Sequence, residues 1–185
     1  MSKIFKAALL AGAVVFAVPA YAKSTIMVGG QEMFASKTIV ENAVNSADHT
    51  TLVAAVKAAG LVDTLSGKGP FTVFAPVNAA FSALPAGTVD TLLKPENKGQ
   101  LAGVLTYHVV AGALTLDDIK AKIKKGDGSA QLKTVAGGTL TASMNGPNNI
   151  ALKDEAGGTA NITIYDVMQS NGVIHSIDKV LLPKS

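Results

Sequence analysis

The sequence predicts a mixed α+β domain, and the order of its local patterns carries that prediction. Apolar residues recur at helical spacing through much of the first two thirds of the chain, whereas from Gln131 onward short alternating runs are separated by turn signals. Helices followed by a β meander are the order expected of an α+β fold. No segment repeats, and residues 23–185 have the length of one domain.

Residues 1–22 have the pattern of a signal peptide. Two lysines precede an apolar run from Ala7 to Val18, and the Ala-Tyr-Ala sequence at 20–22 has the small residues of a signal-peptidase site. The run is shorter than the roughly 20 apolar residues that span a bilayer. We therefore expect cleavage after Ala22 and export of the mature protein to the periplasm, the cell surface or the extracellular medium.

The next segment, residues 23–35, shows no clear periodicity. We expect an extended leader with few contacts that proteases cut easily, because termini with few apolar anchors are rarely ordered. Leu52, Val56 and Ala59 then recur at i, i+4 and i+7 and predict a helix that ends at Gly60. The candidate N-terminal caps of this helix are Ser46, Asp48 and Thr50.

The stretch FTVFAPVNAAFSAL, residues 71–84, predicts a strand that turns into a helix. Residues 71–75 alternate with the period-2 pattern of a strand with two usable faces. Pro76 follows, and Asn78 opens a short helical segment. Asn is among the best N-caps, so we expect Asn78 to cap that helix and to fix the corner.

Two more helices are expected before the strands begin. Thr88 is predicted to cap a short helix, and Pro95 suits the first turn of a helix that runs to about Tyr107. His108 lies at i+7 on the apolar face of that second helix. In the segment 114–128, acidic residues come early and lysines late, the order that suits a helix dipole.

The last third of the chain reads as strands joined by turns. Asn145-Gly146, Gly157-Gly158 and Asn171-Gly172 separate alternating runs, and the last of these pairs is the strongest hairpin signal in the chain. The predicted strands cover residues 139–143, 150–152, 160–167 and 173–182.

Three segments resemble the motifs of the fasciclin domain, in its secreted single-domain bacterial form, over residues 36–183. The first is GPFTVFAPVNAAF at 69–81, with Val77 where Thr is more usual. The second is LTYHVVAG at 105–112, and the third is NGVIHSIDKVLLP at 171–183. The resemblance implies a β sheet folded on itself as a wedge or sandwich, with several helices packed against it. It also places the first and third motifs on neighbouring core strands, where Asn78 and His175 have structural roles.

The resemblance further implies an exported, non-catalytic protein that mediates adhesion by binding a protein or a surface polysaccharide. In animal matrix relatives of this family, a Tyr-His pair and a motif ending in Asp, an aliphatic residue and Leu or Met are attributed integrin binding. The corresponding residues here are Tyr107, His108, Asp166 and Met168, although Ile164 and Tyr165 differ from the polar residues that open the second motif.

Two interpretations of His108 and Tyr107 are open, and they predict different results when each residue is mutated. The position of His108 on the apolar helix face favours a buried side chain with a structural hydrogen bond. Tyr107 lies one position off that face, so we expect its ring to reach solvent and to make the contact with a partner. A recognition role for both residues is the alternative.

Composition and spacing argue against several other functions. The chain has no cysteine, and all of its 16 basic residues are lysine, whereas nucleic-acid readers rely on arginine forks and aromatic stacking. His49, His108 and His175 lack the spacing of a helical metal pair, and no nucleophile elbow occurs. We expect no enzyme activity, cofactor, metal, nucleic acid or transmembrane segment, and a monomer. The resemblance also implies an alternative function, a carrier of an apolar small molecule such as a carotenoid, because some secreted fasciclin-like proteins of algae bind carotenoids. The composition of this chain, in which 48% of the residues are hydrophobic, is compatible with that alternative.

Overall fold

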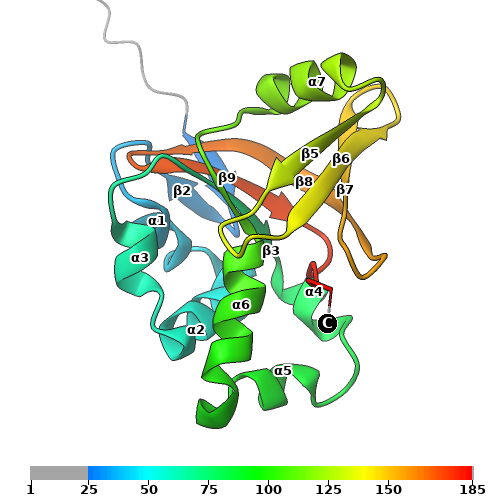
Figure 1. The fold of residues 1–185 in the computed structure, drawn as a ribbon. Helices are drawn as coiled ribbons and strands as arrows, with labels where there is room; N and C mark the ends of the chain where they lie inside the picture. The colour runs from blue at the N-terminus through cyan, green and yellow to red at the C-terminus, as the bar shows by residue number, and fades with distance from the viewer. Residues whose placement is uncertain (1–24, 185) are drawn as a thin grey trace, which may run out of the picture.

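The computed structural model describes residues 25–184, and a curled seven-stranded sheet lies at its centre (Figure 1). One helix, α7, covers one side of the sheet, and the other helices gather on the opposite side and end of the molecule. This mixed architecture confirms the predicted α+β class. The helices are α1 (Ile39–Ala43), α2 (Thr50–Ala59), α3 (Val62–Ser66), α4 (Asn78–Ser82), α5 (Thr88–Leu92), α6 (Lys98–Tyr107) and α7 (Leu116–Lys125). Short 3₁₀ turns precede α2 at Ala47–His49 and α6 at Pro95–Asn97.

The large sheet has the order β4-β3-β9-β8-β7-β6-β5, and all its pairs except β3–β9 are antiparallel. The parallel pair joins β3 and β9 from Phe71 opposite Gly172 to Pro76 opposite Ile177. The expectation that the first and third motifs lie on neighbouring strands is therefore confirmed. The strands are β3 (Phe71–Pro76), β4 (Val109–Ala111), β5 (Ser129–Lys133), β6 (Thr139–Asn145), β7 (Asn149–Lys153), β8 (Thr159–Gln169) and β9 (Gly172–Ile177).

The sheet folds on itself until its two end strands meet at one point. Val110 of β4 forms an isolated antiparallel bridge with Thr134, next to the end of β5. The Val135 N–H also donates to the Val109 carbonyl at 2.7 Å. The long strand β8 makes the necessary bend, because its pairing with β9 shifts register between Ile162 and Val167.

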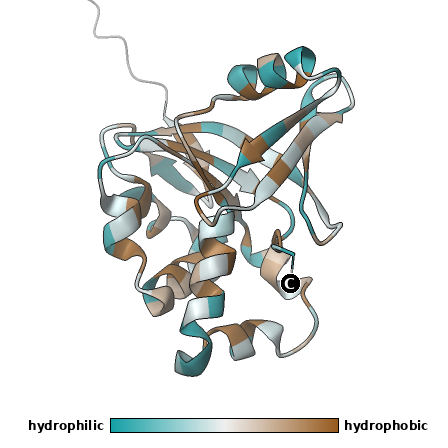
Figure 2. Cartoon of the chain, viewed as in Figure 1, coloured by the Kyte–Doolittle hydropathy of each residue, from teal (hydrophilic) through white to brown (hydrophobic). Residues whose placement is uncertain are grey.

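Strand β3 separates two hydrophobic cores, as its alternating sequence predicts. Val73 and Ala75 belong to the core beneath the helices α1, α2 and α6. Phe74 belongs to the core enclosed by the curled sheet and α7. Figure 2 shows α7 as mostly hydrophilic, with hydrophobic residues on the side toward the strands; these include Ile119 and Ile123, which are buried.

The helix boundaries agree with the sequence more closely than the helix caps do. Gly60 ends α2 in the left-handed conformation, with φ of 72°, as predicted. The predicted caps Ser46, Asp48 and Thr50 are wrong, because the N-cap of α2 is His49 and its side chain makes no capping bond. Thr88 is likewise the first residue of α5, whose N-cap is Gly87.

The segment expected to be an extended leader is a β-hairpin that packs on the domain. Strands β1 (Ile26–Val28) and β2 (Gln31–Met33) pair antiparallel across a turn at Gly29-Gly30, and both glycines have positive φ. The side chains of Val28 and Met33 are buried in the core under the helices. The expectation of few contacts is therefore wrong for residues 26–33. The predicted signal peptide and its cleavage site lie outside the described residues.

Candidate functional site

His108 is a buried structural residue at the end of α6, as its place on the apolar face predicts. Only 2% of its surface is exposed. The Leu181 N–H donates to its Nε2 at 2.9 Å, so this nitrogen is the acceptor, and Nδ1–H donates to the Val104 carbonyl at 2.8 Å. Burial lowers the pKa of His108 from 6.5 to about 4. The ring is therefore neutral near pH 7, and it ties the C-terminal segment to α6.

The prediction that Tyr107 reaches solvent is wrong, because none of its surface is exposed. Its hydroxyl donates to the Thr139 carbonyl at 2.9 Å and accepts from the Glu155 N–H at 3.0 Å. A side chain at Gly138 would place its Cβ 2.6 Å from the ring. Burial is also the main reason that the pKa of the hydroxyl is raised. Tyr107 thus fastens α6 to the turns beside β6 and β7, and in this conformation it presents no surface to a partner.

Asp166 and His175 hold together the bulge in β8. Asp166 has φ of 57°, and its carboxylate accepts from the N–H of Leu116, the first residue of α7, at 2.7 Å. Its own N–H donates to His175 Nδ1 at 3.3 Å, so His175 Nε2–H donates to the Leu114 carbonyl at 2.8 Å. His175 is fully buried and stacks on Phe74, with ring centroids 5.7 Å apart. Burial lowers the pKa of His175, which favours the neutral ring.

Met168 is the one candidate binding residue whose side chain is well exposed, with 44% of its surface accessible. It lines a groove of about 170 Å³ between β8 and the N-terminal hairpin. Phe34, just after β2, lines the same groove and is 38% exposed, with the Lys37 ammonium 5.0 Å from its ring centroid. We name this feature the Met168 groove; its walls also include Ile26, Ala35 and Asp166.

The sequence does not predict the hairpin wall of the Met168 groove, because residues 23–35 show no clear periodicity and indicate only an extended leader with few contacts. The Gly29-Gly30 pair between apolar residues was the available signal, since two consecutive residues with positive φ suit a tight hairpin turn. A Cβ at Gly29 would lie 2.6 Å from the Asp48 nitrogen. The turn therefore sits directly against the 3₁₀ turn before α2, and this contact fixes the hairpin on the domain.

Asn78 is a cap, but not of the helix that the sequence predicts. Val77 is the N-cap of α4, and Asn78 is its first residue. The Asn78 Oδ1 accepts from the Thr51 N–H, in the first turn of α2, at 3.0 Å. Its Nδ2 donates to the Ala47 carbonyl at 2.8 Å. Asn78 thus satisfies the start of α2 from the β3–α4 corner, which is still a structural role.

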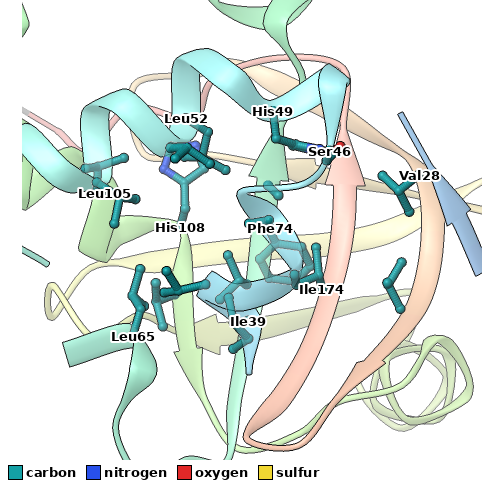
Figure 3. Close-up of a pocket in the computed structure, with 18 of the residues that line it drawn as sticks. Val28, Ile39, Ser46, His49, Leu52, Leu65, Phe74, Leu105, His108 and Ile174 are labelled. Atoms are coloured by element: carbon teal, nitrogen blue, oxygen red, sulfur yellow. Dashed lines mark hydrogen bonds between the residues drawn. The ribbon is translucent and has the colours of Figure 1, made fainter. Parts of the chain in front are cut away.

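An apolar cavity lies between α1, α2 and the sheet (Figure 3). Its volume is about 60 Å³. Leu52, Leu105 and Ile174 are among the side chains around it, together with the rings of His49 and His108. Small-molecule sites are typically about 300–1,000 Å³, so this cavity is far below the size of a polyene site.

His49 forms a buried chain of hydrogen bonds with two serines. Its Nδ1 lies 2.9 Å from Ser46 Oγ and its Nε2 lies 3.3 Å from Ser176 Oγ. All three residues are at most 3% exposed, so a substrate has no access to these hydroxyls. These hydrogen bonds instead link the start of α2 to β9. Burial also lowers the pKa of His49.

The predicted residues do not form one site. Asp166, His175 and Met168 lie together on β8 and β9, whereas Tyr107 and His108 bond to other segments and Asn78 serves α2. Within residues 25–184, no three His, Cys, Asp or Glu side chains gather as a metal site requires. None of the helices in that range has both the length and the apolar character needed to cross a bilayer.

Comparison with known proteins agrees with this architecture. The model of the Fasciclin domain family matches residues 47–183. "Protein sll1483" of Synechocystis sp. is 49% identical over 146 residues, which cover 79% of this chain and 73% of that protein. The "Cell surface glycolipoprotein MPB83" of Mycobacterium bovis is 41% identical over 123 residues, which cover 66% of this chain and 48% of that protein.

A solved structure supports the same conclusion at the level of the fold. The FAS1 domain pair of the insect cell adhesion molecule Fasciclin I superimposes with a TM-score of 0.68 at 19% identity. The match covers 79% of this chain and 51% of that one, so this chain spans about half of the domain pair. With the family model matched over most of its length, the chain belongs to the Fasciclin domain family.

Proposed function

We propose that this chain is an exported, non-catalytic adhesion protein that binds a protein or polysaccharide through the Met168 groove. The observation that carries the proposal is the pairing of two exposed apolar side chains, Phe34 and Met168, beside the ordered carboxylate of Asp166. Aromatic and Met side chains are enriched in binding interfaces, and exposed apolar residues that gather around one groove favour an interaction site over residues that are exposed singly.

The surroundings of the groove favour a prebuilt surface. Val167, between Asp166 and Met168, is buried, so the alternation of β8 turns Met168 outward. The Ser170 N–H donates to the Lys37 carbonyl at 2.8 Å, and Asn42 bonds to Gln169. These bonds hold the end of β8 against the segment that carries Phe34. Binding of a partner would therefore carry little free-energy cost for ordering the groove.

Export and surface location are part of the same proposal. The signal-peptide pattern of residues 1–22 and the name of the cell surface relative MPB83 support them. We propose cleavage after Ala22 and a monomeric mature protein in the periplasm or outside the cell. Mass spectrometry of the exported protein should find Lys23 at the N-terminus, and an uncleaved chain starting at Met1 would contradict the cleavage.

The carrier alternative has weaker support from the structure. The cavity under α2 is apolar, but its volume of about 60 Å³ would have to grow several-fold to reach the roughly 300 Å³ of a small ligand site. An absorption spectrum of the protein purified from its natural source tests this alternative. A bound polyene would colour the protein, and a colourless protein would leave adhesion as the proposal.

The adhesion proposal is tested by attaching the producing cells to surfaces coated with the purified protein. The double variant Phe34→Ser/Met168→Ser should reduce the number of attached cells strongly. Met144→Ser is the matched control, because Met144 is 38% exposed and lies on β6, away from the Met168 groove. Equal attachment to the double variant and the unaltered protein would overturn the proposal.

A further inference from the structure

The chain has two Asn-Gly pairs, Asn145-Gly146 and Asn171-Gly172, and the structure places them in opposite surroundings. In such a pair the backbone nitrogen of the glycine can attack the side-chain amide carbon of the asparagine, because glycine has no Cβ to hinder the approach and its backbone is conformationally permissive. In a folded protein this reaction depends on the exposure of the pair, on a free glycine nitrogen and on a free asparagine amide.

Asn171-Gly172 is locked into the sheet. The side-chain amide of Asn171 makes three hydrogen bonds of 2.8–3.0 Å with the backbone groups of Ile39, Leu65 and Gly67. Gly172 is buried and is paired on both sides, with Phe71 of β3 and Gln169 of β8. A Cβ at Gly172 would collide with the Phe71 carbonyl, so there is no room around its nitrogen. Reaction of this pair therefore requires local opening of the sheet.

Asn145-Gly146 lies at the exposed end of β6, where the chain turns toward β7. Gly146 has φ of 82°, and a Cβ built on it would meet no atom within 4 Å, so the space around its nitrogen is open. Within residues 25–184, the Gly146 N–H donates no hydrogen bond, and the Asn145 amide makes a single one, from Nδ2 to Asn161 Oδ1 at 2.7 Å. This pair thus meets the three conditions that Asn171-Gly172 does not meet.

The single bond of Asn145 belongs to a short chain that links β6, β8 and the segment after β9. The Asn161 N–H and Nδ2 donate to the two carboxylate oxygens of Asp178, at 2.7 and 2.9 Å. These bonds fix the orientation of the Asn161 amide, so its Oδ1 faces Asn145. A carboxylate at position 145 would place an acceptor against this acceptor and a negative charge near Asp178. The bond from β6 to β8 would then be lost.

We propose that Asn145 is a site of spontaneous deamidation, and that its product releases the end of β6 from β8. The Gly146 nitrogen loses its proton and bonds to the side-chain carbon of Asn145, and ammonia leaves. Water then opens the five-membered imide at either carbonyl and gives aspartate or isoaspartate at position 145. Overall, an amide and water become a carboxylate and ammonium. Isoaspartate also lengthens the backbone by one carbon, which disturbs the pairing of Asn145 with Asn149. This inference does not depend on the adhesion proposal.

The test incubates the purified protein at mildly alkaline pH, with and without urea, and follows both positions by proteolytic digestion and tandem mass spectrometry. In the folded protein, position 145 should convert to the acid at least about tenfold faster than position 171, which reacts only through local opening. In urea the two positions should react at similar rates. Equal rates in the folded protein would overturn the proposal, and so would reaction of position 145 in urea alone or a product without isoaspartate.

The effect of the product on the sheet is tested with Asn145→Asp, which reproduces the aspartate form. Asn148→Asp is the matched control, because it adds the same charge in the same exposed turn but lies outside the bonds that join Asn145, Asn161 and Asp178. Asn145→Asp should have the lower urea midpoint and faster amide hydrogen exchange at the end of β6. Equal midpoints, or equal exchange there in the two variants, would overturn the proposed release of β6.

Discussion

Acidification should destabilise the folded protein through its buried histidines, and His108 permits a worked magnitude. Its pKa is about 4 in the folded state, against an ordinary value of 6.5. Below pH 6.5 the unfolded chain therefore binds a proton that the folded protein does not, and stability falls as the pH falls. The stabilisation is complete above pH 6.5 and is lost progressively between there and about pH 4.

At 1.36 kcal/mol for each pKa unit, His108 alone should remove about 2 kcal/mol of the free energy of unfolding between neutral pH and about pH 5. The full shift corresponds to about 3 kcal/mol. Burial also lowers the pKa values of His49 and His175, so both add to the loss in the same direction. All three pKa values are lowered because a charged imidazole in the core would lose its hydration by water, which favours the neutral ring.

Urea denaturation at a series of pH values, for the unaltered protein and for His108→Gln, is the assay. Gln carries no proton in this range, so the variant should show a shallower dependence of the unfolding free energy on pH, by about 2 kcal/mol over the same interval. Its absolute stability will also be lower, but the slope is the readout. Parallel pH profiles for the two proteins would refute the assignment of His108 as a buried neutral ring.

Three further variants test the structural assignments, each by chemical denaturation. Asn78→Ala should cost about 0.5–2 kcal/mol, because the Thr51 N–H loses its acceptor; an unchanged midpoint would show that Asn78 does not cap α2. Tyr107→Phe should cost about 1–3 kcal/mol, because the Thr139 carbonyl and Glu155 N–H lose their shared partner, and a neutral result would contradict the buried hydroxyl. Gly29→Ala should destabilise the hairpin, since φ of 58° and the close Asp48 backbone both oppose a side chain; its matched control is Gly30→Ala, which meets no nearby atom but shares the positive φ.

The strands were predictable because their signals are local. Alternation in residues 71–75 and the Asn171-Gly172 turn each depend on neighbours in sequence, and the structure has β3 and the β8–β9 hairpin at those positions. The parallel pairing of β3 with β9 joins residues about one hundred positions apart, so it entered the prediction through the family resemblance and not through any pattern.

The side-chain roles were less predictable because they depend on contacts between distant segments. The cap from Asn78 to Thr51 crosses 27 positions, whereas capping rules describe neighbours within one turn. The burial of Tyr107 has a similar cause. If α6 had only one apolar face, Tyr107 would be exposed. The end of α6 instead lies between two cores: His108 lines the cavity under α2, and Tyr107 packs in the core of the curled sheet.

Adhesion through the Met168 groove is tested most directly by comparing Met168→Ser with Tyr107→Phe in the cell-attachment assay, with the denaturation midpoint measured for both. Met168→Ser should lose attachment at an unchanged midpoint, because the Met168 side chain is exposed at the groove. Tyr107→Phe should lower the midpoint and keep attachment, because its side chain is buried. Full attachment by Met168→Ser together with lost attachment by a stably folded Tyr107→Phe would show that the protein does not bind through the Met168 groove.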